Sequence, residues 1–349
     1  MSFNRGLMIR LLAVMTVVIV LAVLVFYLQI RSFAYSAMDV PQEGKIYTVV
    51  AGQGLIRVAG SLQKQGVISD ADKFVWYARF AGNADHIKAG EYELESGMAP
   101  VDLLQQLIEG RVKQYPLTIV EGWTFSQLRN ALAEQEKISH LLKGKSDAEV
   151  MTLLGFPGQH PEGHFLPDTY LFPAGSRDID ILRRAHEALT KVLEVEWSRR
   201  EADLPYQTAY DALIMASIVE KETAVTSERE QIAGVFVRRL KKRMRLQTDP
   251  TVIYGMGDTY KGNIRKRDLK ADTPYNTYTR RGLPPTPIAL AGQPAIRAAL
   301  HPDKGDALYF VAKGDGSHYF SSTVEEHNRA VRKYQLRRTQ NYRSTPKQD

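Results

Sequence analysis

The sequence predicts a mixed α+β protein, with a single N-terminal transmembrane helix, a small α/β module and a larger mixed α+β domain. Three observations predict this class. Residues 11–28 are uncharged and apolar, short strand and helix patterns alternate over residues 46–113, and longer helical patterns fill the chain after residue 114. The expected boundaries are an N-terminal segment at 1–6, a transmembrane helix at 7–30, a linker at 31–45, the module at 46–113, the larger domain at 114–336 and a basic, flexible tail at 337–349.

The apolar segment at 7–30 is long enough to cross a bilayer core, which needs about 20 residues in a helix. A helix also satisfies every backbone hydrogen bond inside the membrane. Arg5 and Arg10 precede the uncharged run at 11–28 and favour a cytoplasmic N-terminus. A cleaved signal peptide, cut near Ser32-Phe33-Ala34, is the alternative. Because signal peptides usually have a shorter apolar region, we expect an uncleaved anchor.

The composition excludes several kinds of chemistry. The chain has no cysteine, which rules out disulfides, a thiolate nucleophile and cysteine-based metal sites. His160 and His164 flank Pro161 and Gly163, which spoils a helical metal-binding motif, so we expect neither metal nor cofactor. The net charge of +7 suggests an acidic partner. Since the basic residues lie beyond the membrane segment, anionic lipid or an anionic polymer fits better than nucleic acid.

The small module shows alternating strand and helix patterns. Residues 46–50 and 90–94 read as strands. Helical spacing of apolar residues predicts a helix through Leu62 that stops at Gly66, a second helix begun by Asp70 or Asp72, and a third from 101 to 108 ended by Gly110.

The larger domain reads mostly as helices. We expect strands at 117–120 and 308–312, helices at 123–132, 179–200, 209–221, 228–244, 296–300 and 323–334, polar helix at 133–160, and turns with short strands at 246–289. Ser227 and Glu230 form a capping pattern for the helix at 228–244.

The helix predicted at 209–221 carries the clearest candidate for catalysis. Thr208 and Asp211 form a capping box, and the helix is apolar on nearly all sides, which predicts burial. Glu220 lies at its C-terminal end, where desolvation and the helix dipole both raise a carboxyl pKa. A general acid needs such a pKa at neutral pH. The alternative is an ordinary polar helix end, with Glu220 paired to a basic neighbour; Glu222 should point elsewhere and be solvated.

Loops after residue 246 carry side chains suited to sugars. Aromatic rings stack on pyranoses, while amide and carboxylate groups bind hydroxyls in fixed directions. The candidates in these loops are Gln247, Asp249, Tyr254, Tyr275, Asn276 and Tyr278. The alternative is turn chemistry that only holds the loops together.

Ordered motifs across most of the chain resemble the endolytic murein transglycosylase family of bacteria. They are Glu162-Gly163-x-x-x-Pro167-Asp168-Thr169-Tyr170, Ala216-Ser217-Ile218-Val219-Glu220-Lys221-Glu222, Leu246-Gln247-Thr248-Asp249-Pro250-Thr251, Asp272-Thr273-Pro274-Tyr275-Asn276-Thr277-Tyr278, Gly282-Leu283-Pro284-Pro285-Thr286-Pro287-Ile288, and Gly314-x-Gly316-x-His318-x-Phe320 with Glu326-His327-Asn328. Residues 46–113 resemble, more loosely, a LysM-like carbohydrate-binding module; a plain spacer is the alternative.

The resemblance implies a lyase of the bacterial inner membrane that faces the periplasm and cuts peptidoglycan glycan strands internally, leaving 1,6-anhydro-N-acetylmuramoyl ends. Glu220 matches the family's catalytic glutamate, and Glu162 and His318 join the candidate substrate-binding residues through their motifs. Penicillin-binding glycan synthases are the implied partners. Two alternatives remain: a hydrolase that uses water with a second acid such as Asp249, and a non-catalytic wall-binding scaffold.

Overall fold

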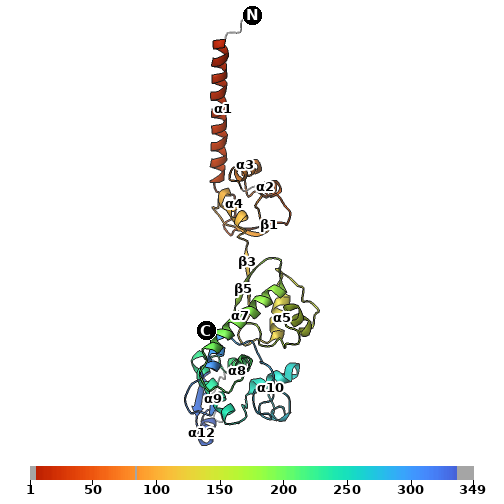
Figure 1. Ribbon diagram of the computed structural model, residues 1–349, viewed down its shortest axis with the longest axis vertical. Coiled ribbons are helices and arrows are strands. Elements are labelled where there is room, and N and C mark those ends of the chain that lie inside the picture. The colour runs from red at the N-terminus through yellow and green to blue at the C-terminus, as the bar shows by residue number, and fades with distance from the viewer. Residues whose placement is uncertain (1–4, 83–84, 336–349) are drawn as a thin grey trace. The chain divides into compact units, whose positions relative to one another are not determined.

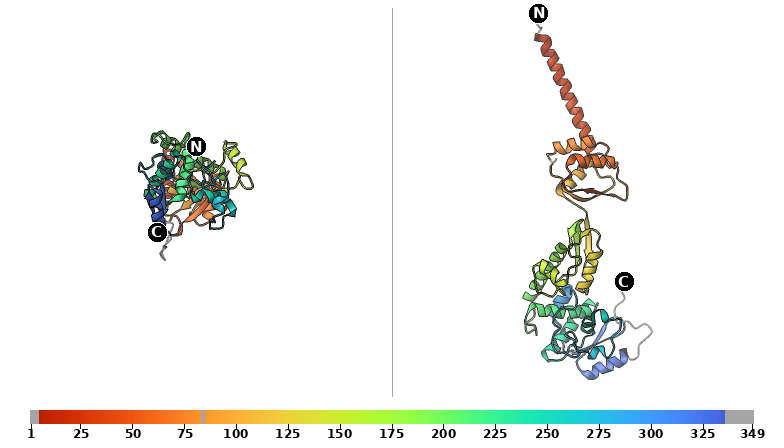
Figure 2. Two further views of the ribbon diagram at one scale, coloured as in Figure 1. Left: turned by 90° about the horizontal axis from the view of Figure 1, so that it is seen from below. Right: turned by 90° about the vertical axis from the view of Figure 1, so that its right-hand side faces the viewer.

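The computed structural model describes residues 5–82 and 85–335, which fall into two compact units, Met1–Tyr115 and Pro116–Asp349. Figures 1 and 2 show the elements of each unit. Helices and short strands are mixed in both, which confirms the α+β class. The predicted tail at 337–349 and most of the N-terminal segment at 1–6 lie outside the described residues.

The first unit combines one long helix with a small α/β module. Its elements are α1 (Arg5–Ala34), β1 (Lys45–Val49), α2 (Leu55–Lys64), α3 (Ala71–Phe80), β2 (Gly90–Leu94) and α4 (Pro100–Glu109). β1 and β2 pair antiparallel with Tyr47 opposite Tyr92, and both rings are buried against the three short helices. The strands and helices predicted for this module are therefore confirmed.

Helix α1 is long and apolar enough to cross a membrane. Its C-terminal end differs from the expected linker at 31–45, because the helix continues to Ala34. Phe33, Met38 and Val40 are buried in the core of the module. The residues after the apolar span thus form part of a folded core. The sequence indicated a linker here, because charged residues such as Arg31 and Asp39 alternate with the apolar ones.

The second unit is mainly helical, with short two-stranded pairings. Its elements are β3 (Gln114–Thr118), α5 (Phe125–Glu134), β4 (Ile138–Ser139), α6 (Asp147–Leu154), β5 (Thr169–Pro173), β6 (Ser176–Arg177), α7 (Asp178–Ser198), α8 (Ala209–Glu222), α9 (Arg229–Lys241), α10 (Asp249–Met256), α11 (Gln293–Leu300), β7 (Tyr309–Ala312), β8 (His318–Ser321) and α12 (Val324–Tyr334), with single 3₁₀ turns η1 (Thr226–Glu228), η2 (Gly257–Thr259) and η3 (Asp268–Lys270).

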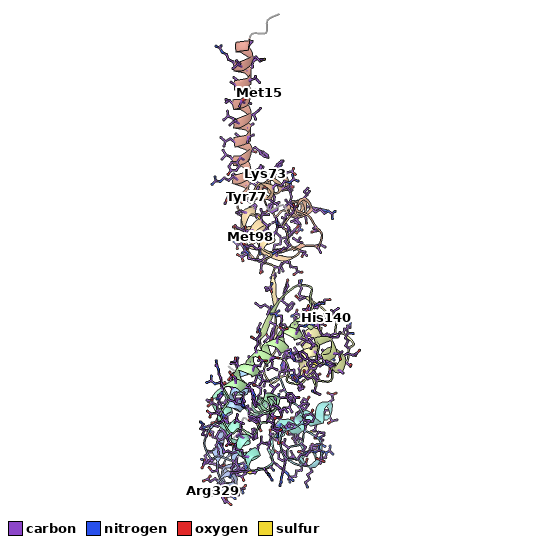
Figure 3. The ribbon with its side chains drawn as sticks, viewed as in Figure 1. Met15, Lys73, Tyr77, Met98, His140 and Arg329 are labelled. Carbon is purple, nitrogen blue, oxygen red and sulfur yellow. The ribbon has the colours of Figure 1, made fainter. Side chains whose placement is uncertain are left out.

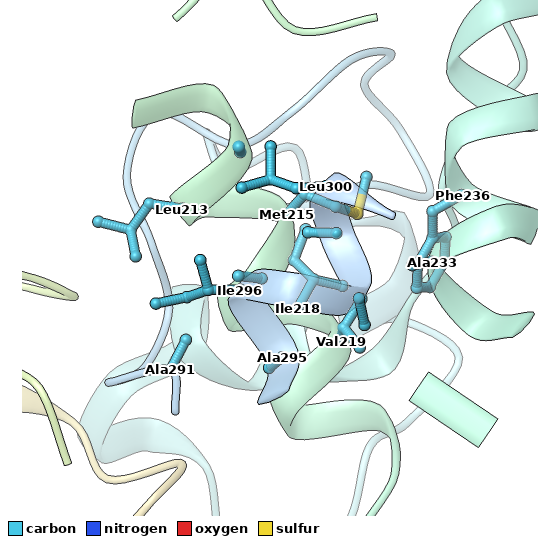
Figure 4. Close-up of a cluster of buried hydrophobic side chains, with 14 of the residues drawn as sticks. Leu213, Met215, Ile218, Val219, Ala233, Phe236, Ala291, Ala295, Ile296 and Leu300 are labelled. Carbon is cyan, nitrogen blue, oxygen red and sulfur yellow. The ribbon is translucent and has the colours of Figure 1, made fainter. Parts of the chain in front are cut away.

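Helix α8 lies at the centre of this unit. Every residue from Ala212 to Val219 is buried, as the apolar sequence predicts. Helices α7, α9, α10 and α11 all pack against it. Figure 4 shows Met215, Ile218 and Val219 of α8 among side chains of α9 and α11. This packing fixes the position of the helix end that carries Glu220.

Three local expectations for the second unit differ from the structure. Residues 133–160 hold one short helix, α6, and otherwise turns and the strand β4. Residues 246–289 hold helix α10 and 3₁₀ turns, and no strand is assigned there. Helix α9 begins after the 3₁₀ turn η1, and Ser227 makes no cap to it. Pro250 stands in the first turn of α10, a position where proline favours a helix. In the sequence this proline indicated a turn, and so the helix was missed.

Candidate active site

Helix α8 is held in place at both ends by hydrogen bonds. At its start, the Thr208 hydroxyl accepts from the Asp211 amide at 3.2 Å, and the Asp211 carboxylate accepts from the Thr208 amide at 3.0 Å, which confirms the capping box. Near its end, the Ser217 hydroxyl accepts from the Ile288 amide at 3.0 Å. The segment that follows Ile288 therefore passes beside the last turn of the helix.

The carboxyl group of Glu220 is enclosed at this end of α8. One oxygen, Oε1, lies 2.8 Å from Nη2 of Arg229, and the other, Oε2, accepts from the Gly292 amide at 3.0 Å. The Glu220 side chain is only 4% exposed and that of Arg229 7%. The same Arg229 nitrogen lies 3.1 Å from Oε2 of Glu121. The structure thus contains both features expected of Glu220, burial and a basic partner.

These contacts act on the Glu220 pKa in opposite directions. Burial raises the pKa of Glu220 above its ordinary value, and the nearby Glu121 raises it further. The Arg229 guanidinium and the Gly292 amide lower it, because both stabilise the carboxylate. Burial has the largest effect, so the pKa remains raised. Burial thus favours the protonated carboxyl group, and Arg229 lies beside it when the proton leaves.

The loop before helix α5 closes over the same region. The Gly122 amide donates to the Leu290 carbonyl at 2.9 Å, and the Leu290 amide donates to the Trp123 carbonyl at 2.7 Å. Lys221 Nζ donates to the Gly122 carbonyl at 3.1 Å. These hydrogen bonds join three segments that are far apart in sequence around Glu220. The sequence alone did not predict that the three segments meet there.

Glu222 differs from its expected solvated position. Burial raises the pKa of Glu222 to about 7, and Asp249 raises it too, while a hydrogen bond with Thr248 lowers it. The helical spacing correctly placed Glu222 on another side of α8 from Glu220. Glu222 is half-buried, because the segment around Thr248 and Asp249 covers part of that side of α8.

Four of the predicted substrate-binding residues line one pocket of about 690 Å³. These residues are Gln247, Asp249, Tyr278 and His318, and Glu222 and Arg239 line the pocket with them. The Tyr278 hydroxyl donates to Asp249 Oδ1 at 2.6 Å. Gln247 has a φ of 52°, which is strained for a residue with a side chain and is typical of functional loops. Lys221 and Glu222 line this pocket from α8, whereas Glu220 faces Arg229 and Gly292.

His318 is fixed in this pocket by a carboxylate that the sequence did not suggest. His318 Nδ1 lies 2.8 Å from Oε2 of Glu228, and the His318 amide donates to Oε1 at 2.9 Å. Both side chains are nearly buried. A carboxylate at Nδ1 orients an imidazole ring and leaves Nε2 for another partner.

The remaining four predicted residues make contacts within the protein. Glu162 is 3% exposed, accepts from the Phe125 amide at 3.0 Å and the Tyr254 hydroxyl at 3.2 Å, and has a pKa raised by burial to about 7. Tyr275 packs edge-on against Tyr254 and bonds Thr286. Asn276 is 1% exposed and donates to three backbone carbonyls. These contacts match the alternative of turn chemistry, and a substrate role for the four residues stays a prediction.

Comparisons with known proteins extend over most of the chain. The YceG-like family model matches residues 47–333. The endolytic murein transglycosylase of Bacillus subtilis is 35% identical over 303 residues, which are 82% of this chain and 83% of that protein. The enzyme of the same name from Streptococcus pneumoniae R6 is 30% identical over 85% of this chain, and the match spans 60% of its length. A crystal structure of a putative yceG-like protein from Listeria monocytogenes matches with a TM-score of 0.52 and 31% identity, covering 83% of this chain and 99% of that one.

Proposed function

Because the chain belongs to the YceG-like family, whose similar members carry the name endolytic murein transglycosylase, we propose that it cuts the glycan strands of peptidoglycan internally. The bond cleaved is the one between N-acetylmuramoyl and N-acetylglucosaminyl residues. The product is a strand that ends in 1,6-anhydro-N-acetylmuramic acid.

In the proposed reaction Glu220 acts first as an acid and then as a base. It donates a proton to the glycosidic oxygen while the bond from that oxygen to C1 breaks. The resulting carboxylate accepts the proton of the muramoyl C6 hydroxyl, whose oxygen forms the new bond to C1. No water is consumed, so the reaction is that of a lyase and needs no second carboxylate, unlike common glycosidases.

The observation that carries this proposal is the enclosed carboxyl group of Glu220 beside Arg229. Burial raises the pKa and favours the acid form, while Arg229 at 2.8 Å stabilises the carboxylate formed in the first step. The surroundings of Glu220 therefore support both its role as an acid and its role as a base. The resemblance of the motif around Glu220 to the one that carries the family's catalytic glutamate supports the same assignment.

The pocket that contains Gln247, Asp249, Tyr278 and His318 is the proposed place for part of the glycan strand. It offers carboxylate, amide, phenol and imidazole groups, which can bind sugar hydroxyls and N-acetyl groups. Glu222 adds a carboxyl group whose pKa of about 7 allows it to donate or accept there.

The anchor sets the proposed location. We propose that α1 lies in the bacterial inner membrane, with the N-terminus in the cytoplasm and the small module and the second unit in the periplasm. Burial of Ile30 and Ala34 in the structure supports an uncleaved anchor, because cleavage near Ala34 would remove part of a packed region. An enzyme held there meets strands as they emerge, so it can end their elongation beside penicillin-binding glycan synthases.

The small module is proposed to bind glycan in the manner of LysM-like domains. A polar pocket of about 640 Å³ lies where β1 turns into α2 and includes Gln53, Arg57 and Asp85. Glycan binding by the module is tested by sedimenting the protein with insoluble peptidoglycan. If the pocket binds glycan, Arg57→Ala should reduce the amount of protein that sediments. An unchanged amount would favour a module that acts only as a spacer.

The reaction type is tested by digesting purified glycan strands and examining the new ends by mass spectrometry. We expect anhydro-muramoyl ends inside long strands. Reducing ends would contradict the proposal and favour a hydrolase that uses a second acid such as Asp249. Binding without any cleavage would favour a scaffold.

A further inference from the structure

The last turns of α1 are joined to the module without a hinge. Ile30, Phe33 and Ala34 are at most 8% exposed, and Phe33 belongs to the same core as the strands of the module. Because the helix end is packed into the core, the orientation of α1 in a bilayer also fixes the orientation of the module.

Helix α3 lies beside these last turns. The rings of Phe26 in α1 and Trp76 in α3 meet edge-on, with centroids 5.8 Å apart. The Trp76 and Phe80 rings also pack together, with centroids 5.7 Å apart, and Tyr77 interacts with Tyr35, the residue that follows α1. Figure 3 shows Lys73 and Tyr77 beside the C-terminal end of α1.

The contact with Phe26 determines how deep α3 lies. Phe26 precedes the buried Ala34 by eight residues, which is about 12 Å along a helix. The transmembrane helix expected at 7–30 ends at Ile30, four residues and about 6 Å after Phe26. Trp76 therefore lies within about one helical turn of the edge of the hydrocarbon core, a level at which tryptophan is enriched in membrane proteins.

The two faces of α3 differ in a way that matches this depth. Phe74, Val75 and Ala78 are buried in the module. Trp76 and Phe80 project outward and are 41% and 58% exposed. Arg79 lies over the Trp76 ring at 5.7 Å. Large aromatic side chains with a basic residue beside them are typical of helices that lie in the interface of a membrane.

From this geometry we propose that α3 lies in the bilayer interface on the side of the module, with Trp76 and Phe80 at the level of the upper acyl chains and Arg79 among the lipid phosphates. The bilayer that α1 crosses is the partner of this surface. The module then has two membrane contacts, α1 and α3, which together determine its orientation on the bilayer. The proposal concerns only the first unit and does not depend on the reaction.

The absence of cysteine in the chain allows a direct test. The full-length protein is prepared with one cysteine at a time, Phe80→Cys, Lys73→Cys, Ile46→Cys or Leu21→Cys, and labelled with an environment-sensitive fluorophore. Each variant is reconstituted into vesicles of phosphatidylethanolamine and phosphatidylglycerol with nitroxide-labelled acyl chains, which quench fluorophores near them. Ile46 is the matched control, because it is exposed on β1, which Figures 1 and 2 show on the side of the module away from α1.

We expect the label at position 80 to lose most of its emission, the label at 73 to lose part of it, and the label at 46 to keep it. The label at 21, inside α1, should be quenched fully. Equal emission at 80 and 46 with quenching at 21 would overturn the proposal. So would emission at 21 that the nitroxide lipids leave unchanged, because α1 would then not lie in the bilayer.

Discussion

Glu220 is a carboxyl group on which its neighbours act in opposite directions. Burial and Glu121 favour the protonated form, whereas Arg229 and the Gly292 amide favour the ionised form. The sequence predicted the first influence from the apolar helix around Glu220. It offered a basic partner as the alternative, but it could not identify Arg229 or Gly292, because Gly292 lies 72 residues away along the chain and nothing local marks Arg229 as the partner.

Two substitutions should move the pH dependence of cleavage in opposite directions. Activity requires protonated Glu220 and is lost as pH rises through its pKa. Arg229→Gln removes a group that lowers this pKa, so the alkaline limb of kcat/KM should move to higher pH. Glu121→Gln removes a group that raises the pKa, so the limb should move to lower pH.

The measurement is the rate of anhydro-end formation from glycan strands across pH. Thermal melting at each pH serves as the control, because Arg229 is buried and its loss can weaken the fold. Shifts of both variants in the same direction would contradict the electrostatic account of Glu220.

At the scale of elements, the sequence predicted those that carry strong local signals. Helix α8 has a capping box and a continuous apolar run, and both its ends were expected within a residue. Helix α10 was missed because Asp249 and Pro250 suit a turn as well as a helix start. The pocket beside Glu222 was missed for a different reason. Its lining residues come from several elements that are far apart in sequence and meet only in the folded protein.

A ladder of stacked rings joins the elements around α7. Phe156 stacks on His186 with centroids 4.0 Å apart, His186 lies 5.9 Å from His164, and His164 lies 5.5 Å from Tyr210 of α8. Nε2 of His164 is buried and has no hydrogen-bond partner among the described residues. Burial accordingly lowers the pKa of His164 to about 4.

Replacing His164 should change how stability depends on pH. His164 stays neutral in the folded protein, while the unfolded chain takes up a proton below about pH 6.5, so its contribution to stability is lost as pH falls from 6.5 toward 4. His164→Phe keeps the stacking and removes the titration. Urea unfolding in detergent should show that this variant is at least as stable as wild type at pH 7 and loses less stability at pH 5.

His164→Ala is the control, because it removes the ring itself. It should destabilise the protein at both pH values, by roughly 1–3 kcal/mol. A pH dependence of His164→Phe equal to that of wild type would show that the buried imidazole is not the titrating group.

In the whole molecule, one N-terminal helix is long and apolar enough to serve as a membrane anchor. The sequence predicted the anchor from charge and length, but it predicted a linker where α1 in fact runs into the core of the module. Apolar residues at 33, 38 and 40 are too few to show a periodic pattern, which explains the difference.

Release from the membrane should change which strands are cut. A secreted form lacking residues 1–28 removes most of the span and keeps Ile30, which is buried. If the anchor limits how far Glu220 lies from the membrane, cells with this form should show an altered distribution of glycan strand lengths. The strand lengths are measured by chromatography after an amidase has released the glycan strands from their peptides. Unchanged lengths would show that the anchor only localises the protein.

The central claim is that Glu220 performs the acid–base chemistry of a transglycosylase. It is tested most directly by comparing Glu220→Gln with Glu222→Gln, a matched change two residues away on α8, in the same mass-spectrometric assay for anhydro ends. Glu220→Gln should reduce the rate by roughly 100-fold or more in a protein that still folds, because the general acid and base are both lost. Glu222→Gln should still form anhydro ends, with a raised KM. Near-normal cleavage by Glu220→Gln, or loss of cleavage only in Glu222→Gln, would contradict the account.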